Sequence, residues 1–309
     1  MIFLTLQQLH YVLTIADAGS FNKAAEMLYV SQPSLSNAVR DLEKELSISI
    51  FHRSGRGVTL TNDGAEFLLY ARQVYHQYEQ LQEKYSGAET LKKKFGVSAQ
   101  HFSFAVKAFA ELVNSYDTAE YEFAIRETKT REVIDDVSTL KSEVGILFLS
   151  DFNRPFLSKL FRSNGLSFHK LIECKTYVYL WREHPLAKKK SIRFSDLANY
   201  PNLSFEQSDN SSFYFAEEIF SQNEYPRSIK VSDRATVLNL MVGLDGFILC
   251  SGIICEELNG SDYVAVPFEE GKGGIMEIGY ITRQDSRLSR VGERYIEELK
   301  KYLNNAKTE

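Results

Sequence analysis

The N-terminal part of the chain carries a pattern that few folds can accommodate. Apolar side chains recur at helical spacing three times within residues 6–46. Gly19 ends the first of these helices, and Ser20 and Ser31 are suited to cap the second and third. The segment IFHRSGRGVTLT then alternates in polarity around two glycines, as a short hairpin does. Three helices followed by a hairpin predict a winged helix-turn-helix over residues 1–61.

The third predicted helix has an apolar side for packing and a polar side suited to DNA. Ser, Gln, Asn and Arg side chains can hydrogen-bond phosphates or base edges, and the N-terminal end of such a helix enters the major groove and favours a phosphate. Arginines on a wing suit backbone or minor-groove contacts. The predicted DNA-binding residues are Ser31, Gln32, Pro33, Ser34, Ser36, Asn37 and Arg40 on the helix, with Arg53 and Arg56 on the wing.

The charge balance indicates that one such domain binds DNA weakly. The whole chain has 36 Lys and Arg against 41 Asp and Glu, a formal net charge of −5, which excludes a large, uniformly basic surface. Any nucleic-acid binding must come from a local cluster of cations. Residues 1–66 have a formal net charge of −2. Two or more domains acting together are therefore implied.

A long helix predicted for residues 62–91 offers a way to bring two domains together. Its apolar positions follow one another at steps of 3, 4, 3 and 7 residues, a heptad-like seam with a gap at Gln82. A lone helix with a narrow apolar stripe does not fold by itself, so its simplest partner is the same helix of a second chain. The predicted dimerisation residues are Leu68, Ala71, Tyr75, Tyr78 and Tyr85.

Residues 92–309 alternate between strand and helix patterns, which predicts α/β layers with largely parallel sheets. The three cysteines are too few and scattered for a disulfide framework or a zinc site, and fit a reducing cytosol. We find no signal peptide, no apolar run long enough to span a membrane and no P-loop, G-x-G-x-x-G, H-E-x-x-H or nucleophile elbow. The expected protein is cytoplasmic, with no catalytic residue, metal or cofactor.

Residues 20–64 resemble, without a gap, the DNA-binding domain of the LysR-type transcriptional regulators. The shared motifs are AA-x-x-L, V-S-Q-P-S-L-S and L-F-x-R-x-x-R-x-x-x-L-T, the last with Ile50 in place of its leucine. The C-terminal part resembles the family's effector-binding half only in order and layout, including L-x-x-x-x-V-G-I and W-R-E-H-P-L-A. Ser142 and Glu143 stand at the positions where the family usually has a glycine and an acidic residue before that V-G-I.

The resemblance implies a winged helix-turn-helix, a dimerising linker helix and a bilobal α/β regulatory domain like a periplasmic binding protein. It implies dimers or tetramers on interrupted inverted repeats of double-stranded DNA. It also implies a small effector in the interdomain cleft that changes DNA bending and, in an activator, contact with RNA polymerase. The expected subdomains are residues 93–163 with 270–305, and residues 164–269. The alternatives are a DNA-binding protein without a ligand, its cleft closed by apolar side chains, and an enzyme built on the α/β half.

In the family's regulatory fold the effector lies where strands end and helices begin, which is a general location for ligands in open α/β sheets. Hydroxyls and free N–H groups at helix starts can hold a carboxylate, so we expect a metabolite that carries a carboxylate or another oxyanion. Two of the hydroxyls, those of Ser98 and Thr128, are equally suited to capping helices. The predicted effector-binding residues are Ser98, Gln100, His101, Thr128, Thr130 and Ser204.

Overall fold

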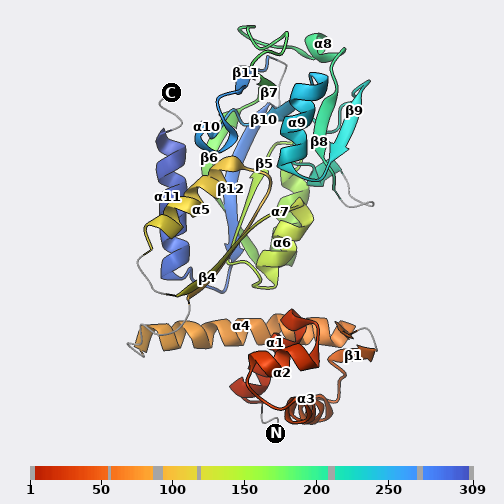
Figure 1. Ribbon diagram of the computed structural model, residues 1–309, viewed down its shortest axis with the longest axis vertical. Helices are drawn as coiled ribbons and strands as arrows, with labels where there is room; N and C mark the ends of the chain where they lie inside the picture. The colour runs from red at the N-terminus through yellow and green to blue at the C-terminus, as the bar shows by residue number, and fades with distance from the viewer. Residues whose placement is uncertain are drawn as a thin grey trace. The chain divides into compact units, whose positions relative to one another are not determined.

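The computed structural model describes residues 4–54, 57–85, 93–116, 120–207, 213–269 and 274–305. The chain forms two compact units, Met1–Leu91 and Lys92–Glu309, which are treated separately below (Figure 1). Within the described residues, no helix combines the length and apolar character needed to cross a membrane.

The N-terminal unit has the expected order of three helices, a hairpin and a long helix. Ser20 and Ser31 each accept a hydrogen bond from a backbone N–H in the first turn of the helix that follows, and Gly19 ends the first helix in the left-handed conformation. The elements are α1 (Leu6–Ala18), α2 (Phe21–Met27), α3 (Gln32–Leu46), β1 (Phe51–Ser54), β2 (Gly57–Leu60) and α4 (Asn62–Tyr85).

The core of this unit joins α1, α2, α3 and the first half of α4. Leu68 and Ala71 of α4 are only 6% and 2% exposed and belong to the same cluster as Val12 of α1 and Leu35 of α3. Gly64 allows α4 to lie close to Ile50, the residue before β1, because a side chain at position 64 would collide with the Ile50 carbonyl. The beginning of α4 is thus part of the winged-helix domain.

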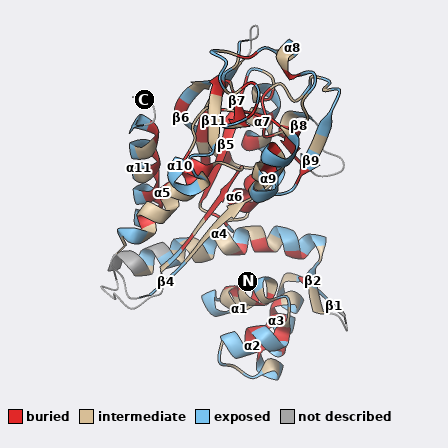
Figure 2. Ribbon diagram, turned by 45° about the horizontal axis from the view of Figure 1, so that its top comes forward, coloured by how far each residue is buried: buried red, intermediate tan, exposed pale blue. Residues whose placement is uncertain are grey.

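The first subdomain of the C-terminal unit is built on a five-stranded sheet in the order β4-β3-β5-β12-β6. Helices α5 and α11 pack on one face and α6 and α7 on the other (Figure 1). Figure 2 shows the result, a sheet whose central strand β5 is buried along its length. The elements are β3 (Lys93–Ala99), α5 (Ser103–Asn114), β4 (Tyr121–Glu127), α6 (Thr130–Ser138), β5 (Val144–Leu149), α7 (Arg154–Ser163), β6 (Leu166–Lys175), β12 (Ile275–Arg283) and α11 (Arg290–Asn305).

The second subdomain is smaller and contains an antiparallel sheet, β10-β7-β11, and a parallel pair, β8-β9. An isolated bridge between Asn202 and Phe247 links the two. The elements are β7 (Tyr177–Trp181), α8 (Phe194–Leu197), β8 (Asn202–Phe205), the 3-10 turn η1 (Phe213–Phe215), β9 (Ser228–Val231), α9 (Arg234–Leu244), β10 (Ile248–Cys250), α10 (Glu256–Asn259) and β11 (Tyr263–Pro267).

Two sequence-based expectations about this unit need correction. The predicted boundary after residue 163 is wrong, because β6 pairs along its whole length with β12 in the first subdomain's sheet. The chain therefore crosses to the second subdomain after Lys175. The sheets are also less parallel than predicted, because β12 runs antiparallel to both of its neighbours. Alternating strand and helix patterns do not reveal which strands pair at long range.

Candidate DNA-binding surface and ligand pocket

Helix α3 presents one polar face to solvent. Pro33, Asn37, Arg40 and Lys44 are exposed and follow one another at steps of 4, 3 and 4 residues, which puts them on one side of the helix. The opposite side is buried in the core described above. We refer to these four residues as the α3 face. It contains three of the side-chain types that contact phosphates or base edges.

The start of α3 is only partly free to contact a ligand. Ser31 caps the helix by accepting from the Ser34 N–H at 3.2 Å, and the two serine hydroxyl oxygens lie 2.7 Å apart. Ser34 is exposed, whereas Gln32 is half-buried. Both predicted roles at this end, capping and DNA contact, are therefore compatible with the geometry.

Ser36 does not extend this surface as expected, and Arg53 has partners inside the domain. Ser36 is buried and its hydroxyl accepts a hydrogen bond from Arg53 Nη1 at 2.7 Å. The same guanidinium lies 4.3 Å from the centroid of the Phe21 ring and 3.9 Å from a carboxylate oxygen of Glu43. Arg53 thus ties the wing to α2 and α3. Its side chain is nevertheless 38% exposed, so its contact with DNA stays a prediction. Arg56 lies outside the described residues.

Tyr29 is a candidate DNA contact that the sequence analysis missed. It lies in the turn between α2 and α3, its side chain is 96% exposed, and its backbone is in the left-handed region with φ of 55°. A bulky residue in that region is strained, and strain that persists is a pointer to function. The sequence did contain a signal for this residue, because an aromatic side chain stands at a turn position that asparagine or glycine would occupy more easily.

The predicted dimerisation seam packs mainly inside the domain. Leu68 and Ala71 are core residues, and Tyr75 stacks on His10 of α1 at a centroid distance of 5.1 Å. Tyr78 is half-buried beside Tyr75, and the Tyr85 side chain lies outside the described residues. The helical periodicity was correct, but Leu68, Ala71 and Tyr75 pack within their own domain, Tyr75 against α1. A dimer contact through Tyr78 and Tyr85 stays a prediction.

A different stripe of α4 is apolar and exposed. Tyr70, Val74 and Leu81 are 59%, 50% and 56% exposed, and with the exposed Gln77 they follow one another at steps of 4, 3 and 4 residues. That spacing is heptad-like. We refer to these four residues as the α4 stripe.

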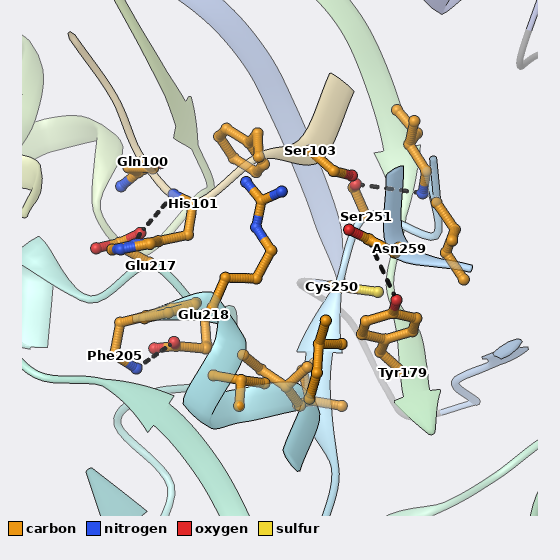
Figure 3. Close-up of a pocket in the computed structure, with 18 of the residues that line it drawn as sticks. Gln100, His101, Ser103, Tyr179, Phe205, Glu217, Glu218, Cys250, Ser251 and Asn259 are labelled. Carbon is orange, nitrogen blue, oxygen red and sulfur yellow. Dashed lines mark hydrogen bonds and ion pairs between the residues drawn. The ribbon is translucent and has the colours of Figure 1, made fainter. Parts of the chain in front are cut away.

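The C-terminal unit contains a pocket of about 90 Å³ between its two subdomains. The loop before α5 and the start of that helix supply one wall, and β7, β8, α9 and β10 supply most of the other. Figure 3 shows Gln100, His101 and Glu217 at one end and Tyr179, Ser251 and Asn259 at the other. Much of the lining is apolar, including Phe102, Phe205, Val237, Leu238, Ile248, Ile253, Ile254 and Met276.

A carboxylate of the second subdomain holds the loop of the first. Glu217 Oε2 accepts a hydrogen bond from the His101 backbone N–H at 2.9 Å and lies 2.8 Å from His101 Nδ1 (Figure 3). Its other oxygen accepts from Gln207 Nε2 at 2.9 Å. The His101 ring stacks on Phe205 at 3.8 Å, so the imidazole is fixed by its ring face as well as by its nitrogen.

Gln100 and Thr130 are also engaged by protein groups. Gln100 donates to the Thr130 hydroxyl at 2.6 Å and accepts from the Phe148 N–H at 3.0 Å. The Thr130 N–H, at the start of α6, donates to Gln207 Oε1 at 3.2 Å. Of the six predicted effector residues, only Gln100 and His101 line the pocket.

The other predicted hydroxyls lie elsewhere. Ser98 is fully buried and its hydroxyl is bonded to Asp136 at 2.6 Å and to Ser142 at 2.8 Å. Thr128 donates to Glu132. Ser204 is buried in β8, and its hydroxyl has no hydrogen-bond partner among the described residues. The sequence analysis was therefore wrong to place these residues at the pocket. A strand end fixes a residue's position in the sheet, but it does not show which protein groups the side chain already binds.

The pocket wall contains both charges and a neutralised acid. Arg234 of α9 forms an ion pair with Glu127 at the end of β4, and burial lowers the Arg234 pKa to about 10, so it stays cationic at neutral pH. Burial, followed by the nearby Glu217 charge, raises the pKa of Glu218 from 4.5 to about 8. One Glu218 oxygen accepts from the Phe205 N–H at 2.7 Å.

The raised Glu218 pKa predicts a pH-dependent stability. The folded protein holds a proton on Glu218 between about pH 4.5 and 8 where the unfolded chain does not, so this group lowers the unfolding free energy as pH rises through that window. We expect Glu218→Gln to remove this decrease and to be the more stable form at pH 8.5. Urea unfolding followed by the fluorescence of Trp181, the only tryptophan, measures it in the C-terminal unit. Glu206→Gln, at an exposed site, is the control, and equal pH slopes for wild type and Glu218→Gln would contradict the assignment.

Metal and thiol chemistry find little support here. In the parts of the chain that the structure describes, no group of three or more His, Cys, Asp or Glu is placed to hold a metal ion. Cys250 lines the pocket, and its burial raises the thiol pKa to about 12. A thiol with that pKa is a poor nucleophile at neutral pH.

Comparison with known sequences agrees with both halves of this description. Residues 6–65 match the bacterial regulatory helix-turn-helix protein, lysR family, and residues 98–304 match the LysR substrate binding domain. The HTH-type transcriptional activator CmpR of Synechocystis is 26% identical over 303 residues, covering 96% of this chain and 94% of that one. A probable RuBisCO transcriptional regulator of Guillardia theta is 47% identical over 70 residues, 23% of each chain.

Solved structures share the fold. A full-length OxyR variant from Pseudomonas aeruginosa has a TM-score of 0.69 at 22% identity, covering 97% of this chain and 95% of that one. Full-length CbnR in complex with its target DNA has a TM-score of 0.57 at 18% identity, covering 97% and 100%. At these identities the likeness concerns architecture alone.

Proposed function

This chain belongs to the LysR family of DNA-binding transcriptional regulators, and we propose that a small molecule held between its two regulatory subdomains controls how it binds a promoter. The observation that carries the proposal is the pocket between the two subdomains, which are joined by side-chain contacts such as His101–Glu217. A molecule bound there touches both subdomains and therefore favours one of their relative positions.

The DNA-contacting surface we propose consists of the α3 face, the start of α3 and Tyr29. Asn37 and Arg40 supply the donors for base edges and phosphates, and Ser34 and Gln32 lie at the end that enters the groove. Tyr29, in the turn between α2 and α3, contacts the sugar-phosphate backbone. Arg56 stays a proposed wing contact on the strength of the sequence alone.

We propose that the α4 stripe pairs with the same stripe of a second chain. An isologous interface needs a self-complementary apolar surface, and exposed Tyr70, Val74 and Leu81 provide one. Two winged helices then bind the two halves of an interrupted inverted repeat, which compensates for the weak charge of each. A dimer of such dimers, and contact with RNA polymerase if the protein is an activator, follow from the resemblance to the family.

The alternatives have weaker support. A regulator without a ligand should have a cleft closed by apolar side chains, whereas this pocket keeps open space beside Ser103, Ser251 and Asn259. The enzyme alternative is less favoured because the relatives compared above are named as regulators of transcription.

The proposal is tested on the DNA upstream of the protein's own gene. We expect specific binding with two protected half-sites and a steep loss of affinity with salt. A molecule that binds the pocket should raise the free energy of unfolding, followed by Trp181 fluorescence, by about 2.7 kcal/mol at 100 times its Kd. The same molecule should change the footprint or the affinity. Specific DNA binding that no stabilising molecule alters would contradict effector control.

The α3 face makes a separate prediction about sequence preference. Asn37→Ala should cost about 1–3 kcal/mol at one base pair and relax the preference there, because a bidentate amide contact is lost. Lys44→Ala, at the far end of the same face, should weaken all sequences about equally. Selection from a randomised operator library compares the two variants with wild type. An unchanged base preference in Asn37→Ala would remove Asn37 from the reading surface.

A further inference from the structure

Three donors converge on one buried side chain in the cleft. The His101 backbone N–H, the His101 imidazole and the Gln207 amide all lie within 2.9 Å of Glu217 oxygens. The Glu217 and His101 side chains are both almost completely buried. Backbone and side-chain donors arranged around a carboxylate in the crevice beyond a strand end are the usual means of binding an anionic ligand. Here the carboxylate is supplied by the protein itself.

Most of the neighbouring charges and donors are paired as well. The Thr130 N–H at the start of α6 is bonded to Gln207, and the charge of Arg234 is paired with that of Glu127. The buried Nε of Arg234 has no hydrogen-bond partner among the described residues, so it can donate to an uncharged oxygen. A free anion would therefore have to displace Glu217 or lie beside Glu217 and Glu218 without an unpaired cation to stabilise it. Either arrangement is unfavourable in a buried site.

The remaining space beside Glu217 has a different character. Its lining is mostly apolar, and the polar groups at its far end are the Ser103 and Ser251 hydroxyls and the Asn259 amide. Ser103 is 7% exposed, and its hydroxyl makes no hydrogen bond with another described residue. An apolar pocket with a few hydroxyls and amides selects uncharged molecules with an oxygen to bond.

We propose that Glu217 is a built-in ligand of the cleft, occupying the place of a free anion, and that the pocket beside it takes a small, uncharged, largely apolar molecule. The ligand class rests on the proposed effector control, because it concerns the same pocket. The role of Glu217 does not, since it can be measured without DNA. This replaces the anionic effector expected from the sequence. The pocket, at about 90 Å³, is smaller than the roughly 150 Å³ cavity that accommodates benzene, so the ligand is small.

Chemical rescue tests the role of Glu217. Glu217→Ala leaves the three donors in place without their acceptor, so we expect the unfolding temperature of the C-terminal unit to fall by roughly 5–10 °C. Acetate should restore part of that loss, whereas chloride at the same ionic strength should not. Glu217→Gln keeps the shape but leaves no room, so it should gain nothing from acetate. Glu206→Ala, the same change at an exposed site of the same subdomain, is the matched control.

The outcomes separate the possibilities. If acetate stabilises wild type as much as Glu217→Ala, the anion site is free and the role assigned to Glu217 is wrong. If Glu217→Ala does not fold, wild type and Glu217→Gln still test the proposal. Stabilisation of either protein by acetate but not by chloride would overturn it, and the absence of such stabilisation in both proteins would support it. Trp181 fluorescence reports each result without DNA, so a failure of promoter binding leaves this test intact.

An isosteric pair tests the ligand class in wild type. Isobutyramide and isobutyrate have the same shape and differ in charge. We expect isobutyramide, up to 100 mM, to raise the unfolding temperature more than isobutyrate does, and Ser103→Ala to reduce that difference. An equal or larger shift with isobutyrate, or no shift with either molecule, would overturn the assignment to uncharged ligands. If isobutyramide binds but leaves the DNA footprint unchanged, the ligand class stands and effector control fails.

Discussion

Replacing Val74 and Leu81 together by Glu is expected to dissociate the protein into monomers. The two side chains are half-exposed on the α4 stripe, outside the winged-helix core, so the change leaves the fold of each unit intact. In a two-fold symmetric interface the stripe meets itself, and the substitution removes apolar contacts and adds like charges in one place. Sedimentation velocity measures the association, and we expect DNA affinity to fall by about 100-fold or more because two binding domains no longer act together.

The control for this prediction lies on another helix. Val242 and Leu244 of α9 are 47% and 49% exposed, and replacing both by Glu adds the same charges at equally exposed positions. That variant should keep the wild-type sedimentation profile. Tyr75→Glu should instead destabilise the winged-helix domain, because Tyr75 packs on His10. An unchanged profile in Val74→Glu/Leu81→Glu would show that the α4 stripe is not the interface.

The contrast between the two faces of α4 explains what the sequence could and could not predict. Helical periodicity identifies the helix and its apolar positions correctly, because spacing is a local property. It does not say whether an apolar face packs on its own domain or on a second chain. Leu68 and Ala71 look like an interface until α1 is placed against them, whereas the more scattered Tyr70, Val74 and Leu81 are the ones left exposed.

The pocket shows the same division. The rule that ligands lie beyond strand ends located Gln100 and His101 at the pocket, since the position of a strand end follows from the local pattern. Glu217 could not be found this way. It is 116 residues from His101 along the chain, and no motif links them. Nor could the sequence show that Ser98 is already bonded to Asp136, because that contact joins strand β3 to helix α6 over 38 residues of the chain.

Arg53→Ala is expected to destabilise the winged-helix domain even when no DNA is present. The guanidinium bonds the buried Ser36 hydroxyl and lies over the Phe21 ring, so its loss leaves a buried hydroxyl without its donor. Glu43, its ion-pair partner, also accepts from the Ile50 and Phe51 N–H groups at the start of β1. We expect a loss of about 2–4 kcal/mol in the unfolding free energy of this unit. Hydrogen exchange of the α1–α3 amides, without DNA, measures it.

The salt dependence of DNA binding separates positioning from direct contact. A residue that contacts a phosphate contributes about 0.9 to the slope of log K against log salt concentration, and its loss lowers the slope by that amount. Arg40→Ala, on the exposed α3 face, should lower the slope and leave hydrogen exchange unchanged. Arg53→Ala should weaken binding with the slope preserved, and Arg53→Lys should not recover stability, because an ammonium cannot donate to Ser36 while stacking on Phe21. If Arg53→Ala lowers the slope and leaves the amides protected, Arg53 is a phosphate contact, as the sequence first indicated.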